Sequence, residues 1–263
     1  MPSKMRENIS YFLTAQYYQW KSLFIYRLQA VIWMVYGSFS VINAYIAVTV
    51  IYNVSSGIAG WTYYQVLMLA AVTSILMNIV IYLIDAGNLI WRMRSGAIDP
   101  YLTKPYSQLM VIMSNFSNNE QLVGIVSGMA LFAYAASQTY IGLQSLAGFI
   151  ILFALGSVAV VLFFLALSVL AYHIFKSGMF IGRMMNLASS VGRFPLTVYG
   201  LVGQAIFSIL IPVGLAYFYP SQVFFGRFSA PGFALVAAAA LLLAYASRKL
   251  FYRLMRGYTS GQG

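Results

Sequence analysis

Residues 146–172 read LAGFIILFALGSVAVVLFFLALSVLAY, a run without a single charged side chain. A helix needs about 20 mostly apolar residues to cross the hydrocarbon core of a bilayer, so this run predicts a membrane-spanning helix. The whole chain agrees, since 62% of its 263 residues are hydrophobic and 7% are charged, against about a quarter charged in an average soluble domain. The sequence therefore predicts an all-α membrane protein.

Further apolar runs on both sides of this one predict more spans. They cover residues 28–52, 61–84, 121–136, 195–217 and 232–247. About six helices are thus expected to cross the bilayer, within one transmembrane domain that covers residues 1–263. The segment 218–231 contains two prolines and a glycine, and is a candidate for a short re-entrant piece that serves as an outer gate, which is tolerable where it is buried in protein or lines water.

The basic residues orient this layout. Of the fifteen Lys and Arg residues, Arg227 alone falls on one side of the predicted spans and all the others fall on the opposite side. Loops rich in Lys and Arg stay in the cytoplasm, so both ends of the chain are expected there, with the protein in the inner membrane of a bacterium. The net charge of +11 is therefore explained by the loops on the cytoplasmic face of the membrane. The expected partner is the lipid bilayer and not nucleic acid.

Before the first span, residues 5–24 have the pattern of an amphipathic helix. Their apolar residues recur at three- and four-residue spacing, namely Ile9, Phe12, Leu13, Tyr17, Trp20, Leu23 and Phe24. Such a helix lies in the membrane interface with its apolar face toward the acyl chains. Packing of this helix against the spans is a compatible alternative.

Catalytic chemistry is not indicated. The acidic residues are Glu7, Asp85, Asp99 and Glu120, all at or near the predicted cytoplasmic boundary, and His173 is the single histidine. Carriers driven by protons or sodium usually place ionisable groups inside the membrane, so this distribution weighs against them. The chain has no cysteine and no G-x-x-x-x-G-K-[ST] motif, which predicts no thiolate metal site and no phosphate loop of its own.

Three polar side chains fall near the middle of predicted spans: Asn43, Asn78 and Gln204. They either line a transport path or form hydrogen bonds between helices, which is the commoner role of such residues. In the span 121–136, Gly124 and Gly128 form a G-x-x-x-G pattern that permits close contact with another helix.

The loop at 91–105, WRMRSGAIDPYLTKP, predicts a short rigid helix on the cytoplasmic face. Gly96 permits a sharp turn, Asp99 is suited to cap a helix, and Pro100 suits its first turn. Pro105 fixes the exit of the chain. This element is either a docking handle for a soluble partner or an ordinary ordered loop.

The same loop carries a resemblance. Its stretch R-S-G-A-I-D-P-Y-L-T-K-P resembles the cytoplasmic element of permease subunits in the type 2 exporter branch of the ABC transporters, where a pattern close to G-x-[IL]-D-x-x-L-x-[RK]-P follows the second span. Further stretches are similar to the same permeases: Arg193-Phe194-Pro195-Leu196, Ile211-Pro212-Val213, Tyr219-Pro220 and Arg256-Gly257-Tyr258-Thr259-Ser260-Gly261. Together they run from about residue 90 to the end.

The resemblance implies a function and a site. It implies a permease subunit of an ATP-driven exporter, without catalysis of its own, that pairs with a second permease subunit as a homodimer or heterodimer. A separate ATPase subunit would bind ATP and Mg, and this chain would bind no cofactor. The coupling element that docks on the ATPase would comprise Gly96, Asp99, Tyr101, Leu102, Lys104 and Pro105, with the amphipathic helix as a second contact.

The substrate stays open at this stage. The 21 tyrosines, 19 phenylalanines and 13 methionines would suit an amphipathic molecule leaving the cytoplasm or the inner leaflet, although every apolar helix bundle shares this composition. A nucleotide-independent channel, or a scaffold subunit of another complex, is the alternative function.

Overall fold

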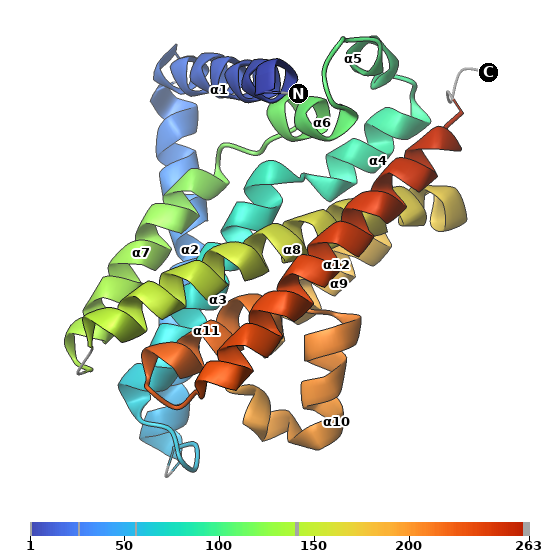
Figure 1. Cartoon of the computed structure of the whole chain (residues 1–263). Helices are drawn as coiled ribbons and strands as arrows, with labels where there is room; N and C mark the ends of the chain where they lie inside the picture. Colours follow the sequence, from blue (N-terminus) through green and yellow to red (C-terminus); the bar gives the residue numbers. More distant parts are fainter. Residues whose placement is uncertain (1, 26, 56, 140–141, 260–263) are drawn as a thin grey trace.

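The computed structural model describes residues 2–25, 27–55, 57–139 and 142–259, and these form helices joined by turns, without a β-strand (Figure 1). In chain order the helices are α1 (Pro2–Ile25), α2 (Arg27–Val54), α3 (Tyr63–Leu83), α4 (Ala86–Arg94), α5 (Asp99–Leu102), α6 (Gln108–Asn115), α7 (Gln121–Ser137), α8 (Leu143–Phe175), α9 (Met179–Val191), the 3₁₀-helix η1 (Leu196–Tyr199), α10 (Gly200–Ala205), the π-helix η2 (Ile206–Leu210), α11 (Gly214–Phe224) and α12 (Ala230–Arg256).

Four stretches of helix among the described residues are long and apolar enough to cross a membrane. They are Val31–Val54, Tyr63–Arg94, Gln144–Phe175 and Ala230–Arg256. The predicted spans 146–172 and 232–247 each lie in one of them, and 28–52 and 61–84 each overlap with one apart from two or three residues at the start. The predicted span 121–136 lies in α7, a shorter apolar helix. The chain is therefore a multi-pass helical membrane protein, as the sequence predicts.

The predicted straight span at 195–217 differs from the structure. Here the chain forms η1, α10 and η2, breaks at residues 211–213 and continues as α11. Pro212 lacks an N–H and disfavours helical geometry at Ile211 before it, where φ is −122° and ψ is 77°. Gly200 interrupts the segment again with φ +64°. The apolar helix over Leu196–Leu210 instead pairs with α9, at a bend of 109°.

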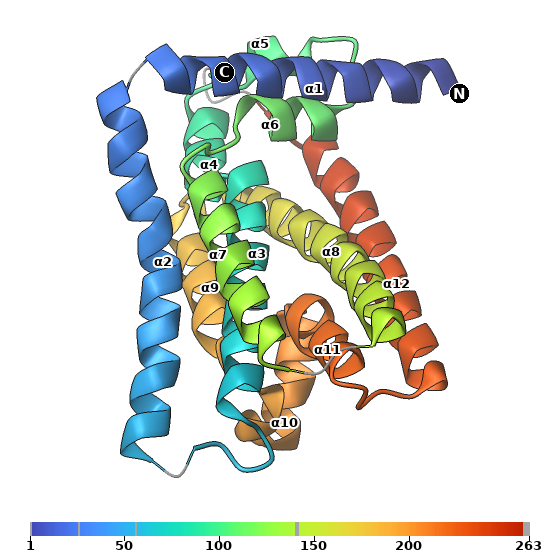
Figure 2. The ribbon, with the colours of Figure 1, turned by 90° about the vertical axis from the view of Figure 1, so that its left-hand side faces the viewer.

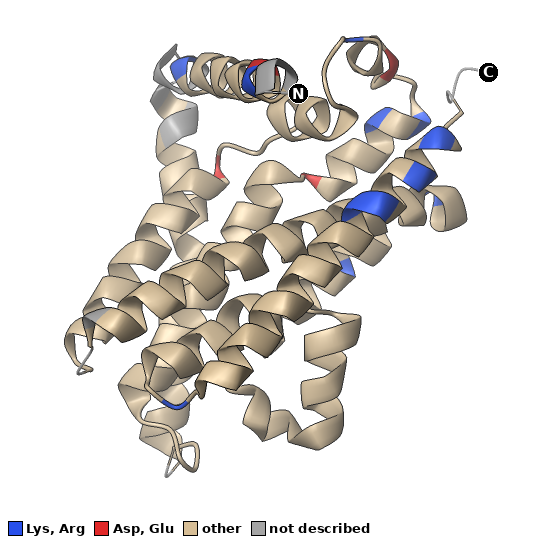
Figure 3. Cartoon of the chain, in the orientation of Figure 1, with Lys and Arg blue, Asp and Glu red and all other residues tan. Residues whose placement is uncertain are grey.

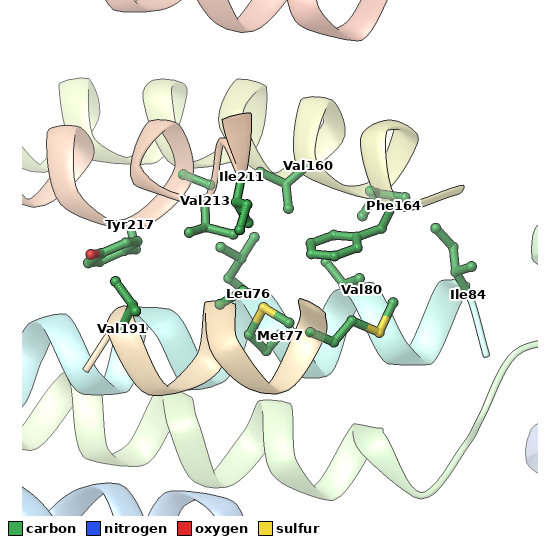
Figure 4. Packing of buried hydrophobic residues seen from close by; sticks show 14 of the residues in the cluster. Leu76, Met77, Val80, Ile84, Val160, Phe164, Val191, Ile211, Val213 and Tyr217 are labelled. Carbon is green, nitrogen blue, oxygen red and sulfur yellow. The ribbon is translucent and has the colours of Figure 1, made fainter. Parts of the chain in front are cut away.

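The core is built around α3, most of whose side chains are buried. Figure 4 shows Leu76 and Val80 of α3 facing Val160 and Phe164 of α8, while Val213 joins the same cluster from the broken segment. This cluster places the break at 211–213 inside the protein, where neighbouring helices shield its backbone from lipid.

Glycines allow the closest helix contacts. A Cβ on Gly124 of α7 would overlap the amide of Asn78 on α3, and one on Gly128 would lie 2.8 Å from Ile75 Cγ1. The G-x-x-x-G pattern therefore permits close contact between α7 and α3, as predicted. On the other side of α7, a Cβ on Gly37 of α2 would lie 2.9 Å from Glu120 O.

The helix α1 lies across one end of the bundle (Figure 2). Two of its polar side chains bind the protein, since Gln16 is buried and Gln19 Nε2 donates to Ser114 O at 2.7 Å, whereas Glu7, Ser10, Thr14 and Lys21 are exposed. Its predicted apolar residues Ile9, Leu13, Tyr17 and Trp20 are exposed instead, Phe12 is half-buried, and the side chains of Leu23 and Phe24 lie outside the described residues. A helix with exposed apolar and exposed charged side chains, held against the end of the bundle, is compatible with a place in the membrane interface.

Candidate functional site

The predicted coupling element forms a compact unit at the end of the bundle that α1 covers (Figure 1). Its residues, 91–105, comprise the last turn of α4, the short helix α5 and the turns around α5. Asp85 accepts a hydrogen bond from Asn88 N at 3.2 Å and caps α4, while Arg92 and Arg94 occupy its last turn, where the helix dipole favours cations. Gly96 then turns the chain with φ +70°, a conformation that glycine adopts without strain.

Buried side chains fix this turn to the core. Met93 and Ile98 on either side of Gly96 are fully buried. Pro100 lies in the first turn of α5, as predicted, but the N-cap position falls on Ile98 and not on Asp99. Asp99 occupies the first turn itself, and its Oδ1 accepts a hydrogen bond of 2.8 Å from the Tyr258 hydroxyl. The carboxylate therefore ties α5 to the chain that follows α12.

Tyr258 lies between α8 and the coupling element. Its hydroxyl is 3.0 Å from Met93 O as well as 2.8 Å from Asp99 Oδ1, so one hydrogen serves two acceptors. Burial, together with the Asp99 carboxylate, raises the pKa of Tyr258, so the hydroxyl stays a donor at neutral pH. Its ring contacts Tyr172 of α8, whose hydroxyl donates to Thr259 O at 3.1 Å.

The far side of the element is held by α1. Lys104 Nζ donates to the Tyr11 hydroxyl at 3.0 Å and lies 4.8 Å from the centre of the Tyr101 ring. Ser107 N donates to Asn8 Oδ1 at 2.9 Å. These two hydrogen bonds join the loop to α1, and the cation–π contact holds Lys104 against α5.

The predicted coupling residues differ in their exposure. Gly96 is buried, Pro105 is exposed, and Asp99, Tyr101, Leu102 and Lys104 are half-buried, with their contacts directed largely into the protein. The exposed outer surface includes Pro100 and Thr103, which the sequence analysis did not select. Their exposure depends on which face of the four-residue helix α5 packs inward, and so short a segment shows no periodicity that reveals it.

Tyr258→Phe is expected to loosen the coupling element without unfolding the protein. A hydrogen bond to a charged group contributes about 1.5 to 3 kcal/mol, and this variant removes the hydroxyl but keeps the ring. Amide hydrogen exchange at residues 96–103 should accelerate by roughly tenfold, as about 1.4 kcal/mol implies, while α3 and α8 stay protected. Tyr245→Phe, at an exposed position on α12, is the control. Unchanged exchange at 96–103 would contradict the assigned role of Tyr258.

A polar pocket of about 390 Å³ lies deeper in the bundle. Two of the three predicted path residues, Asn43 of α2 and Asn78 of α3, line it together with Glu120 and Arg193. Asn78 Nδ2 donates within its own helix to Ser74 O at 2.7 Å, whereas Asn43 Oδ1 accepts from Arg193 Nη1 at 3.0 Å. Gln204 lies elsewhere, on α10.

Most blue segments in Figure 3 gather at the end of the molecule that α1 covers, whereas Arg193 binds Asn43 in the middle of α2. The helix α9 leads the chain away from Lys176 toward the middle of α2 and α3: Thr73 Oγ1 donates to Gly192 O, and Arg193 donates to Asn43. The sequence layout placed Arg193 in a cytoplasmic loop. The structure places it halfway along α2 and α3. The reason is that Arg193 lies at the bend between α9 and the helix over Leu196–Leu210, and not at the end of a span.

Arg227 lies at the opposite end, as the layout predicts. Its Nη2 donates to Gln65 Oε1 at 3.0 Å and its Cζ lies 5.0 Å from the centre of the Trp61 ring. His173 at the end of α8 has its Nε2 3.1 Å from Leu254 O, a contact between α8 and α12 that needs no catalytic role.

Comparison with known proteins supports the resemblance noted in the sequence. The model of a family described as "ABC-2 family transporter protein" matches residues 38–262, which include residues 91–105, most of the residues that line the polar pocket, and Tyr258. No curated protein and no solved structure matches the chain. Since the family model covers most of the sequence, this chain belongs to the ABC-2 family of transporter proteins and is a membrane permease component of an ABC transporter.

Proposed function

We propose that this chain is the membrane-spanning subunit of an exporter, which pairs with a second permease subunit and with separate ATPase subunits that bind ATP and Mg. The observation that carries the proposal is the construction of the loop at 91–105. It is tied to α1 through Lys104, to the chain after α12 through Asp99, and to the core through Ile98. Because the loop is fixed at three places, a displacement of the loop would move the elements to which it is bound.

The elements on either side of this loop lead to the polar pocket. The helix α4 follows α3 after a break at residues 84–85, and α6 precedes α7; α3 carries Asn78, and α7 begins next to Glu120. A displacement of the coupling element upon nucleotide binding would move these two helices relative to α2. Coupling of this kind needs two discrete arrangements that nucleotide biases differently.

The proposed topology has six crossings and both ends of the chain in the cytoplasm. Four crossings are the long apolar helices, α7 is the third in chain order, and the bent pair of α9 with Leu196–Leu210 is the fifth. The short buried helix α11 overlaps the start of the predicted re-entrant segment 218–231 and would act as part of an outer gate. The basic end in Figure 3 then faces the cytoplasm of a bacterium.

The polar pocket is the proposed transport path. Its amides offer hydrogen bonds, Arg193 and Glu120 offer one charge of each sign, and Tyr36, Phe39 and Met77 provide apolar surface. A substrate with an apolar body and a hydrogen-bonding or anionic group fits this lining, which supports an amphipathic cargo. Arg is well suited to bind such groups because its planar guanidinium presents several donors.

Affinity purification of the full chain from its own membrane tests the proposal. An ATPase subunit is expected to co-purify, and Thr103→Trp, which places a bulky ring on the exposed outer surface, should reduce its amount by about fivefold, as about 1 kcal/mol of lost interface energy implies. Val54→Trp, at an exposed position at the opposite end, should leave it unchanged. Asp99→Ala/Leu102→Ala, which weakens the element itself, should reduce it as well.

Absence of any ATPase with the intact chain would favour the nucleotide-independent channel or scaffold. Equal co-purification with Thr103→Trp and with Val54→Trp would instead keep the ATPase but move its docking surface away from α5.

A further inference from the structure

A mainly apolar cavity in the molecule plays no part in the proposed transport path. It has a volume of about 660 Å³, within the usual range for small-molecule sites, and lies between α1, α3, α6, α8 and α12. Its walls are mainly apolar and include Ile79, Leu83, Met110, Met113, Val161 and Leu162. Most of its polar groups are linked at one side, where Ser107 joins Asn8 of α1 to Tyr252 of α12 by hydrogen bonds of 2.9 and 2.8 Å, and Arg248 precedes Tyr252 by one helical turn.

A second hollow of about 520 Å³ continues from this side along α12. It shares Arg248 and Tyr252 with the cavity, and three more cations line it, namely Lys249, Arg253 and Arg256. No acidic residue is among the described residues that line either hollow. The blue part of α12 in Figure 3 lies toward the end of the molecule that α1 covers.

The cavity extends from these cations into the apolar depth of the bundle. The helices α8 and α12 run side by side in the same direction (Figures 1 and 2), and His173 of α8 is level with Leu254 of α12, where they are in contact. Arg248 precedes Leu254 by six residues, whereas Val158 precedes His173 by fifteen. At about 1.5 Å per residue, Val158 lies on the order of 14 Å deeper than Arg248.

We propose that these two joined hollows bind one anionic phospholipid from the leaflet on the basic side of the protein. Its phosphate contacts Arg248, and its acyl chains occupy the cavity beside α8. Basic pockets between transmembrane helices bind anionic headgroups because local cations add to the attraction of the polar headgroup region. A water-soluble phosphate would satisfy the cations but would leave the apolar cavity unfilled, whereas a phospholipid fills both.

A cross-linking probe at position 158 can identify the molecule that occupies the cavity, because Val158 lines the cavity and is 56% exposed. The experiment places a photoactivatable phenylalanine analogue at position 158 of the full chain and supplies phosphatidylglycerol or phosphatidylcholine at equal concentration in mixed micelles. After illumination, mass spectrometry of the intact protein measures the adducts. The expected result is a single phosphatidylglycerol adduct, formed about fivefold more than the phosphatidylcholine adduct, as charge-assisted binding implies.

Variants of the cation locate the headgroup. Arg248→Gln should abolish the preference for phosphatidylglycerol, and Arg248→Lys should keep most of it. Arg183→Gln on α9 makes the same charge change at an exposed position outside both hollows and should behave as the unmodified chain. Equal labelling by both lipids, or a preference that survives in Arg248→Gln, would overturn the proposal.

A second copy of the chain is the competing occupant. If it covers the cavity, the probe at position 158 will form a cross-linked dimer of the chain instead of a lipid adduct, and the lipid site is then excluded. The result is independent of any ATPase, so the outcome does not depend on the proposed function.

Discussion

Gly156→Ala is expected to destabilise the protein by about 2 to 3 kcal/mol, the usual cost of forcing an extra methyl group into a packed core. A Cβ at position 156 of α8 would lie 2.6 Å from Ala216 Cα and would also meet the Leu215 carbonyl. Both contacts are with the backbone of α11, which cannot rotate away as a side chain would. The Tm of the detergent-purified protein should fall by on the order of 5 to 10 °C.

Gly182→Ala is the matched control for this change. Gly182 lies within α9, and a Cβ there would meet no atom within 4 Å. Because alanine favours a helix over glycine by about 1 kcal/mol, this variant should be neutral or slightly stabilised. Equal Tm values for the two variants would show that α11 is not held against α8 as described.

Ser189→Cys is expected to react with an anionic thiol reagent on the order of tenfold faster than with a cationic reagent of similar size. Ser189 lines the polar pocket together with Arg193, and a nearby cation in a medium of intermediate dielectric contributes well over 1 kcal/mol to the attraction of an anion. The chain contains no other cysteine, so the labelled site is unambiguous. Arg193→Gln in the same background should remove most of the preference.

Ser190→Cys tests whether the pocket, rather than the helix, produces this preference. Ser190 is the next residue along α9 and is exposed, but it is not among the described residues that line the pocket. Its cysteine should react with both reagents at similar rates. A preference of the same size at position 190 would assign the effect to the general positive potential of the protein.

Much of the fold follows from hydrophobic length alone. The runs at 28–52 and 146–172 exceed the thickness of the hydrocarbon core, and each lies in one long helix. The run at 195–217 is as apolar, but Pro212 and Gly200 divide it. A hydropathy profile averages over a window of residues and does not detect such breaks. A buried irregular segment has the same apolar side chains as a buried helix, so its mean hydropathy is equally high.

The candidate site was predictable where its chemistry is local. The turn at Gly96 and the position of Pro100 follow from the preferences of these two residue types. The contact of Asp99 with Tyr258 joins residues 159 positions apart, and helical periodicity carries no information about partners at such a distance. The same holds for Arg193 and Asn43, which are 150 positions apart and which bring a cation to the middle of the bundle.

The distance along the chain between Asp99 and Tyr258 also sets a delay during translation. At about 5 to 20 residues per second, a ribosome needs on the order of 8 to 30 seconds to reach Tyr258 after it has made Asp99. During this interval α4 and α5 have been synthesised, but the hydroxyl that ties them to the C-terminal segment is not yet there. A partner that recognises the completed surface can therefore bind only to chains that have been translated past α12. The order of translation then makes insertion of the helices into the membrane precede binding of the partner.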